Sequence, residues 1–397
     1  MYKKTFYIVI TTALLCVGLS GLYTQELCNN SLYSKQKIYF EKLKVPEAWE
    51  LTRGSPEVLI GVIDNGFDFF HPDLKEKLIP GMYANGGYHT EIYENNAHGT
   101  LVASIIAAEM NNKIGVAGFA PGCKMLTVSL GMIEHKLIKL RTEFMQKNPG
   151  AKLEDFQKEM MKHMDVLKDF GRRWVNYQAS SMAAGIRYLT DKGVRIINIS
   201  SLMRTSMIHT PEVLKDLEGA FANAKEKDVL IISGAGNSAT KIEDYPGSEE
   251  NTIIVGAAML DDTRWEKEVK VMGRGVKQGS CYGKHLTVMA PAQNLAVCVP
   301  HDKRMYRSLD GPMGKSENKF TGMYDILPEG ATSSAAPVVS ALAALVLSLR
   351  PDLGASEIVE IIKQGTDDIG EKGFDVYTGY GRVNYLKTLM IAGEWGK

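Results

Sequence analysis

One stretch near the C-terminus limits the choice of fold more than any other: residues 330–349, GATSSAAPVVSALAALVLSL. It begins with small residues, and after Pro337 its apolar side chains recur at spacings of three and four, which predicts a buried helix. Proline is tolerated in a first helical turn, because the N–H that it lacks has no intrahelical partner there. The rest of the chain is therefore expected to fold around this helix.

Ser333 is predicted to lie at the N-terminal end of that helix. Backbone N–H groups are unpaired there and the helix dipole favours negative charge, so the position suits a nucleophile whose reaction builds an oxyanion. A helix N-cap is an equally good interpretation of the serine. This stretch alone does not decide between them.

Strand-like and helix-like patterns alternate along the body of the chain. Apolar runs predict buried strands at residues 58–63, 124–130, 195–200, 229–233 and 252–257. The alternation predicts a three-layer α/β fold, with a mainly parallel sheet flanked by helices. Asp64 and Asn237 then lie just past strand C-terminal ends, where the active sites of open α/β sheets collect.

Four segments resemble the catalytic motifs of the subtilisin-like serine proteases, the subtilases. VLIGVIDNGFDFFHPDL carries Asp64, NNAHGTLVASIIAA carries His98 and ATSSAAP carries Ser333, in that family's chain order. VLIISGAGNSA, which carries Asn237, resembles the family's oxyanion segment. Weaker similarity extends over most of the chain, from about Val45 to Leu389.

The resemblance implies a serine endopeptidase that works through an acyl-enzyme. His98 would take the proton of Ser333, since a serine hydroxyl is a poor nucleophile without a base and imidazole titrates near neutrality. Asp64 would fix the histidine tautomer, and Asn237 would donate to the oxyanion beside the Ser333 N–H. The substrate would be a protein or peptide, and the chemistry would need no cofactor.

Two alternatives remain open. One is a catalytically silent subtilase-fold protein that holds peptides, and the other is a protease dedicated to one precursor. Ser200 and Ser201 are predicted to border the substrate backbone, but they stand where the family commonly has Ser-Leu-Gly. Together with Ala331, which replaces a family glycine, this departure supports the silent protein.

Asp244 is the predicted specificity residue. KIEDYPGSEENTIIVGAA resembles the segment that walls the primary specificity pocket, and alignment on Tyr245 places Asp244 at the pocket base. A carboxylate there would favour Arg or Lys in the substrate. The alternative is a carboxylate that faces solvent or pairs with Lys241.

A structural calcium site is predicted near residues 110–116, MNNKIGV, which resemble the calcium loop of many subtilisins. Asp73 matches the family's carboxylate ligand and Asn112 its amide ligand, and oxygen ligands of these kinds suit Ca²⁺. An ordinary loop is the alternative, because Lys113 brings a positive charge close.

The largest departure from the family is an insertion at about residues 133–178. Its apolar spacing predicts two amphipathic helices joined at residues 148–150, Asn-Pro-Gly. They would form either a surface hairpin or a cover over the non-primed side of the cleft. A second, polar insertion at about residues 301–325 precedes the nucleophile.

The N-terminus predicts export. Two lysines and an apolar run over residues 1–26 indicate a secretory signal peptide, with an uncleaved membrane anchor as the alternative. The protein would then be secreted or periplasmic, in contact with a membrane only if the segment is uncleaved. Residues 27–397 would form one catalytic domain, although the polar stretch at 27–44 is too short for the folded prodomain that secreted subtilases often carry.

Charge and cysteine content bear on the possible partners and cross-links of the protein. The formal net charge is +0, so nothing favours nucleic acid as a partner. Four cysteines follow the N-terminal segment, and they allow three full disulfide pairings or separate buried thiols. The spacing of the cysteines and histidines is not that of a metal site.

Overall fold

A computed structural model describes residues 27–84, 98–130, 136–160, 162–201, 203–271, 274–300 and 322–397. The predicted signal or anchor segment lies outside these ranges, as does most of the second insertion.

The centre of the molecule is a nine-stranded sheet. In spatial order its strands are β12 (Thr366–Asp367), β13 (Arg382–Val383), β9 (Val288–Pro291), β6 (Thr252–Ala258), β5 (Leu230–Gly234), β4 (Ile196–Ile199), β1 (Leu59–Asp64), β3 (Lys124–Ser129) and β2 (Leu78–Tyr83).

Every neighbouring pair in this sheet is parallel except β12 and β13, which run antiparallel. Side chains alternate between the two faces of a strand, so a sheet covered on both sides needs apolar residues at every position. In β1, Ile60 and Val62 belong to one hydrophobic core and Ile63 to the other. The predicted three-layer α/β fold is confirmed.

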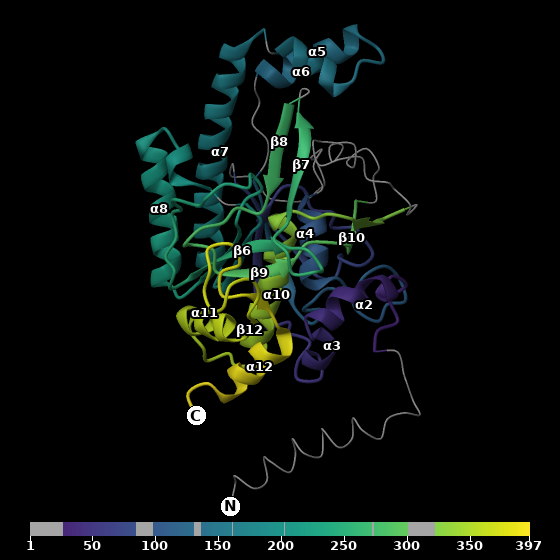
Figure 1. Cartoon of the computed structure of the whole chain (residues 1–397), viewed down its shortest axis with the longest axis vertical. Helices are drawn as coiled ribbons and strands as arrows, with labels where there is room; N and C mark the ends of the chain where they lie inside the picture. Colours follow the sequence, from purple (N-terminus) through teal and green to yellow (C-terminus); the bar gives the residue numbers. More distant parts are fainter. Residues whose placement is uncertain are drawn as a thin grey trace, which may run out of the picture.

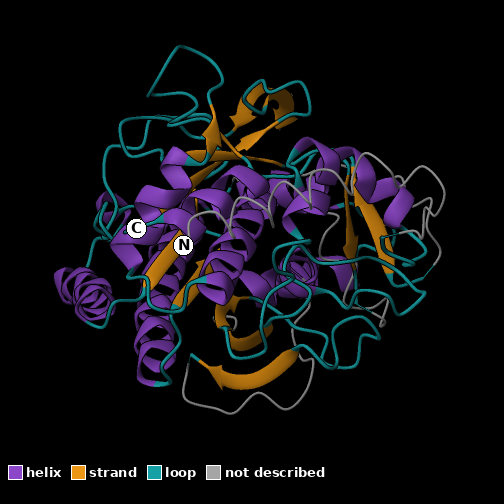
Figure 2. Cartoon of the chain, turned by 90° about the horizontal axis from the view of Figure 1, so that it is seen from below, coloured by secondary structure: helices purple, strands orange, loops and turns teal. Residues whose placement is uncertain are grey.

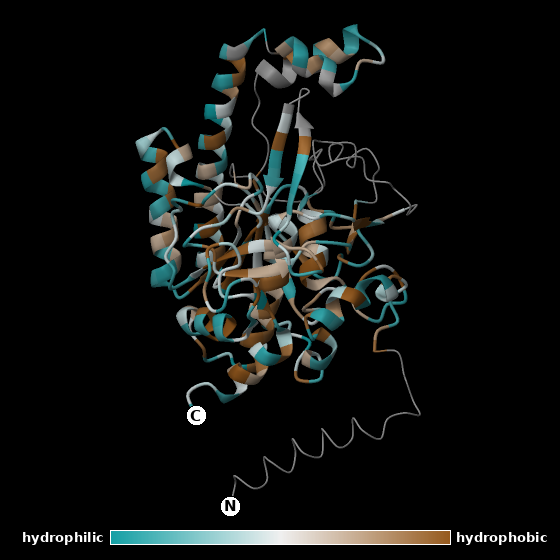
Figure 3. Ribbon diagram, in the orientation of Figure 1, coloured by the Kyte–Doolittle hydropathy of each residue, from teal (hydrophilic) through white to brown (hydrophobic). Residues whose placement is uncertain are grey.

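Helices cover both faces (Figure 1). On one face α7 (Met164–Asp191) and α8 (Pro211–Glu226) pack together and against the sheet. The other face carries α2 (Tyr33–Lys42), α3 (Val45–Ala48), α4 (His98–Ala107), α10 (Thr332–Leu349), α11 (Ala355–Gln364) and α12 (Tyr385–Glu394). Apolar colour follows α10 through the middle of the molecule, in agreement with the predicted buried helix (Figure 3).

Helix α10 differs from its prediction at Pro337. The helix begins at Thr332, so Pro337 is its sixth residue and lies beyond the first turn. The missing N–H therefore leaves the carbonyl of Ser333 without its usual intrahelical donor. Among the helices of the described ranges, only α10 is long and apolar enough to cross a membrane, and it is a core helix with 89% of its span buried.

The first insertion forms α5 (Lys136–Lys147), α6 (Leu153–Met160) and the first part of α7. The two predicted helices joined at residues 148–150 are present as α5 and α6, but the second is shorter than its apolar pattern from Phe156 to Leu167 predicts: there is a break after Met160, and Met164 and Leu167 belong to α7. The break lets the two parts pack on different partners. Phe156 contacts Phe144 of α5, with ring centroids 5.6 Å apart, whereas α7 continues onto the sheet.

The short polar stretch before Lys44 is ordered by a buried aromatic cluster. Tyr39 and Phe40 of α2 are nearly inaccessible to solvent and pack against Trp49 and Phe119.

Two small antiparallel sheets lie outside the central one, β7 (Glu266–Val271) with β8 (Arg274–Gly279) and β10 (Leu295–Cys298) with β11 (Tyr324–Leu327). Figure 2 shows the molecule from below, where helices and strands overlap in the middle of the view. Four cysteines, Cys28, Cys123, Cys281 and Cys298, are buried as thiols rather than joined in disulfides.

Candidate active site

The predicted catalytic residues meet at one edge of the sheet. Asp64 ends β1, and Asn237 follows the end of β5 by three residues. His98 is the first residue of α4, and Ser333 is the second residue of α10. Because the strands are parallel and in register, their C-terminal ends and these helix N-termini face the same cleft.

The cleft has a volume of about 380 Å³. All six residues predicted to carry out catalysis or bind the substrate backbone line it: Asp64, His98, Ser200, Ser201, Asn237 and Ser333. Its remaining walls are mainly apolar and include Leu130, Trp174, Val175, Met203 and Met207. A cleft of this size and lining can take up one or a few side chains of an extended peptide.

A short hydrogen bond joins the acid and the base. His98 Nδ1 lies 2.7 Å from Asp64 Oδ1, which also accepts the Asn65 N–H at 2.7 Å. Burial lowers the pKa of His98, but the charge and hydrogen bond of Asp64 outweigh burial and hold that pKa above its usual value. The contact at Nδ1 leaves Nε2 as the nitrogen that can exchange a proton with a nucleophile.

Ser333 occupies the first turn of α10. Its side chain is nearly buried, and its N–H is one of the helix-terminal donors, for which the described part of the chain supplies no acceptor. Asn237 lies opposite, and its Oδ1 accepts hydrogen bonds from the Thr332 N–H (3.0 Å) and the Thr332 hydroxyl (2.9 Å). With the oxygen held in this way, the NH₂ group of Asn237 is left to donate.

Thr332 is a positioning residue that the sequence analysis did not identify. Besides its two bonds to Asn237, its hydroxyl accepts the Gly236 N–H at 3.1 Å. Three hydrogen bonds therefore tie the oxyanion loop to the N-terminus of the serine helix. A threonine directly before the nucleophile, at the first helical position, was the available signal.

The sequence model of the Subtilase family matches residues 55–381, most of the chain. The chain belongs to the subtilase family. The predicted enzyme class, a serine endopeptidase, is confirmed by this family and its named relatives.

Two relatives and one solved structure illustrate the similarity. A thermophilic serine proteinase of Bacillus sp. (strain AK1) is 29% identical over 339 residues, which are 85% of this chain and 63% of that protein. Thermitase of Thermoactinomyces vulgaris is 25% identical over 363 residues, covering 91% of this chain and 99% of that protein. The crystal structure of fervidolysin from Fervidobacterium pennivorans has a TM-score of 0.62 at 23% identity, over 93% of this chain and 47% of that one, and supports the fold.

Asp244 of this subtilase is not among the residues that line the cleft. Its carboxylate accepts hydrogen bonds from the Thr205 hydroxyl, the Ser206 N–H (2.6 Å) and the Ser206 hydroxyl (3.0 Å). Partial burial alone would raise the pKa of Asp244, but these hydrogen bonds outweigh it and lower the pKa. The carboxylate thus fastens the short 3₁₀ helix η1 (Thr205–Met207), whose Met207 does reach the cleft.

Helix α7 supplies a wall of the cleft. From the sequence, the insertion that contains its first part was expected to form either a surface hairpin or a cover over the cleft. Trp174 and Val175 line the cleft, and Phe170 stacks on Trp174 with ring centroids 6.0 Å apart. The insertion therefore reaches the catalytic residues through its third helix. An aromatic pair at positions i and i+4 was the signal in the sequence.

The predicted calcium residues are adjacent. Asn112 Nδ2 donates to Asp73 Oδ1 at 2.6 Å, and the Val116 N–H donates to Asp73 Oδ2 at 3.0 Å. Oxygen atoms of the loop converge nearby, as calcium would require, but they converge on the side-chain amide of Asn30. Because an NH₂ group has two hydrogens for these four oxygens, and carbonyl, amide and carboxylate oxygens are the ligand types that suit Ca²⁺, the residues present fit a calcium ion.

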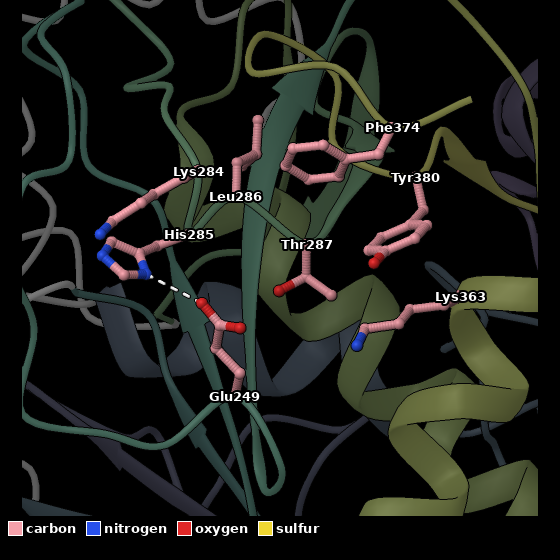
Figure 4. A pocket seen from close by; sticks show the side chains of 8 residues that line it. All are labelled: Glu249, Lys284, His285, Leu286, Thr287, Lys363, Phe374 and Tyr380. Atoms are coloured by element: carbon pink, nitrogen blue, oxygen red, sulfur yellow. Dashed lines mark hydrogen bonds and ion pairs between the residues drawn. The ribbon is translucent and has the colours of Figure 1, made fainter. Parts of the chain in front are cut away.

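A second pocket of about 180 Å³ lies away from the triad (Figure 4). His285 Nδ1 pairs there with Glu249 Oε1 at 3.1 Å, and the Lys363 ammonium lies 5.2 Å from the centre of the Tyr380 ring. Thr287 lines this pocket, but its hydroxyl oxygen already accepts the Ile254 N–H. The Thr287 hydroxyl thus fastens β6 at the wall of this pocket.

Proposed function

We propose that this subtilase is an exported endopeptidase whose nucleophile is Ser333. The observation that supports it most directly is the Asp64–His98 hydrogen bond, at 2.7 Å, in the cleft that also holds Ser333. A buried carboxylate bonded to an imidazole beside a serine is the arrangement that activates a hydroxyl. An inactive peptide-binding protein has no need of it.

The chemistry uses only groups of this chain. Ser333 Oγ forms a bond to the peptide carbonyl carbon while its proton passes to His98 Nε2. The C–N bond then breaks, and His98 returns the proton to the leaving amine. Water, deprotonated by His98 in turn, attacks the acyl-enzyme and releases the acid with Ser333 restored.

The negative oxygen of the tetrahedral intermediate needs donors that are already in place. Asn237 offers its NH₂ group because Thr332 holds the amide oxygen. The Ser333 N–H is the second donor, and it lies at the positive end of the α10 dipole. The site therefore stabilises the oxyanion without reorganising.

Substrate selectivity would come from the apolar wall. Trp174 and Val175 on α7 and Met207 at the end of η1 line the cleft, whereas the one predicted acidic determinant, Asp244, is engaged elsewhere. We infer a preference for large apolar side chains over Arg or Lys. A wall that is built from an inserted helix also favours the dedicated precursor protease over a general one.

The deciding experiment is labelling of the purified full chain with a fluorophosphonate probe. Wild type should be labelled, and Ser333→Ala should not. Ser334→Ala is the matched control, because it removes the neighbouring hydroxyl and should leave labelling intact. Labelling that survives Ser333→Ala would refute the assignment of the nucleophile, and a folded, unlabelled wild type would favour the silent binding protein.

The structure of Ala331 removes one argument for the catalytically silent peptide-binding protein. Ala331 has φ −99° and ψ 179°, an extended conformation that alanine adopts without strain. Its replacement of the family glycine therefore does not distort the approach to Ser333.

Export rests on the N-terminal sequence alone. Fractionation of cells should find the protein outside the cytosol, and a mass spectrum of its N-terminus distinguishes a cleaved signal from a retained anchor. A cytosolic, full-length protein would refute the proposal of export.

A calcium ion, if bound, would act structurally near Asp73 and Asn112 and would take no part in the reaction.

A further inference from the structure

Gln178 on α7 places an amide nitrogen in the wall of the catalytic cleft. The side chain lines the cleft and is 9% exposed, and its Nε2 is a buried donor that bonds to no group in the described part of the chain. Buried polar groups in proteins nearly always have a hydrogen-bond partner, because leaving one unpaired costs stability. In a cleft that takes up a substrate, the missing acceptor is explained by the substrate.

Helix α7 holds Gln178 at this place. Ala179, the next residue, is buried against the sheet, and the helix lies so close to β1 that a Cβ at Gly185 would come within 3.1 Å of Ile63 Cδ1. On the side of α8, Asn176 Nδ2 donates to the Thr210 hydroxyl at 2.7 Å. The backbone at Gln178 is therefore fixed by contacts before and after it, and the helix cannot turn the amide away from the cleft.

A second amide atom of the cleft also lacks a partner. Asn65 Oδ1 is a buried acceptor that bonds to no group in the described ranges, and Asn65 lines the same cleft. The main chain of Asn65 is fully used, since its N–H donates to Asp64 Oδ1 at 2.7 Å and its carbonyl accepts the Gly99 N–H at 2.8 Å. The cleft thus offers a substrate one side-chain donor, on Gln178, and one side-chain acceptor, on Asn65.

This combination selects among the side chains that can enter. An ammonium or guanidinium group has no acceptor for Gln178, and a carboxylate has no donor for Asn65. A phenol or a carboxamide both accepts and donates, and it is uncharged. The other walls, which include Leu130, Trp174 and Met203, are apolar and suit the body of a large side chain.

We propose that Gln178 and Asn65 are specificity-determining residues, which select a large uncharged substrate side chain that ends in a hydroxyl or a carboxamide. Tyrosine and glutamine have this chemistry, and phenylalanine and methionine are their apolar counterparts. An apolar side chain of the same size would fill the cleft and leave both amides unpaired, which is how a polar site rejects a ligand without the polar group. The inference rests on the proposed peptidase function and narrows its preference for large over basic side chains.

The first test uses the wild-type full chain and two matched pairs of peptides. The members of a pair differ only in tyrosine against phenylalanine, or in glutamine against methionine, at each position near the scissile bond in turn. At one position kcat/KM should be about tenfold or more higher for the polar member of at least one pair, and the pair that responds distinguishes a phenol from a carboxamide. Equal cleavage within both pairs at every position, or a preference for the apolar members, would overturn the proposal.

The second test removes the donor. Gln178→Met keeps the length of the side chain and loses the amide, so the preference should fall to about twofold or less, through slower cleavage of the polar member alone. Ser180→Ala is the matched control, because Ser180 is exposed on the same helix, and it should keep the wild-type preference. A loss by the same factor for both members of each pair would mean that Gln178 binds the peptide backbone or supports α7, and would contradict the proposal.

Labelling of Ser333 with the fluorophosphonate probe separates this proposal from the proposed function. A wild type that is labelled and cleaves both members of each pair equally contradicts only the roles of Gln178 and Asn65. A folded wild type that is not labelled contradicts the nucleophile, and this proposal with it. Gln178→Met should be labelled as fast as wild type, since the probe reports on the nucleophile and the substitution lies outside the triad.

Discussion

Two asparagines in this subtilase show how one side chain serves opposite purposes. Asn30 uses both ends of its amide within the protein, with two donors on its oxygen and four acceptors around its nitrogen. Asn237 is held only by its oxygen, and the described part of the chain offers its NH₂ group no acceptor. A donor with no partner in the resting protein is available to a transition state, whereas a fully bonded amide can only stabilise the fold.

The comparison extends to the regions around them. The catalytic edge contains several unfilled hydrogen-bonding groups, including Asp64 Oδ2 and the Ser333 N–H. At the N-terminal junction, where Asn30 meets the loop at residues 109–116, the backbone and side chains of the loop bond to one another and to Asn30. Substitutions at the edge should therefore change the rate and spare stability, and substitutions at the junction should do the reverse.

The largest expected effect comes from His98→Ala. Ser333 then lacks the group that takes its proton, and kcat should fall by about 10⁴-fold or more. The melting temperature should change by only a few degrees, since Asp64 keeps its bond to the Asn65 N–H. Steady-state peptidase assays and thermal melts measure the two quantities, and near-normal turnover would end the triad assignment.

Asn237→Ala should have the next largest effect. The variant loses one oxyanion donor, and kcat should fall by about 100- to 1000-fold while KM changes little, because the oxyanion exists only beyond the ground state. A change mainly in KM would mean that Asn237 binds substrate instead. Asn30→Asp is the counterpart, because Asn30 does not line the cleft, and the folded variant should keep most of its kcat.

Much of the catalytic edge could be predicted from the sequence because its parts are local. Asp64, His98 and Ser333 each lie at a junction of strand or helix that short-range patterns mark, and parallel strands bring such junctions to one edge. The predicted strands at 58–63, 124–130, 195–200, 229–233 and 252–257 correspond to β1, β3, β4, β5 and β6.

The unpredicted parts depend on contacts between distant segments. Strand β2 contains Pro80 and Gly81 and carries a bulge, so it lacks a clear apolar run. The roles of Asn30 and Asp244 depend on partners 79 to 86 and 38 to 39 residues away, which no local pattern specifies. The sequence placed Asn112 correctly beside Asp73, but it could not show that Asn30 Nδ2 lies near four oxygens of the same loop.

Thr332→Val tests whether the free NH₂ of Asn237 depends on how its oxygen is held. Valine keeps the shape and the backbone N–H bond but loses the hydroxyl bonds to Asn237 and Gly236. We expect kcat to fall by about tenfold, corresponding to about 1.4 kcal/mol, with KM nearly unchanged. Thr332→Ser restores the hydroxyl and should recover most of the loss, whereas equal defects in both variants would point to packing of the methyl group.

The smallest expected effect is on pH dependence. His98 must be neutral to accept a proton, so activity is present above its pKa and is lost as the pH falls through it. Asp64 raises that pKa, and the acidic limb of kcat/KM should have its midpoint above 6.5, the value of an unperturbed histidine. The comparison is completed by an NMR titration of His98 in Ser333→Ala with and without Asp64→Asn, where the pKa should fall once the charge is gone. A midpoint below 6.5, or a pKa that Asp64→Asn leaves unchanged, would mean that burial rather than the carboxylate controls the base.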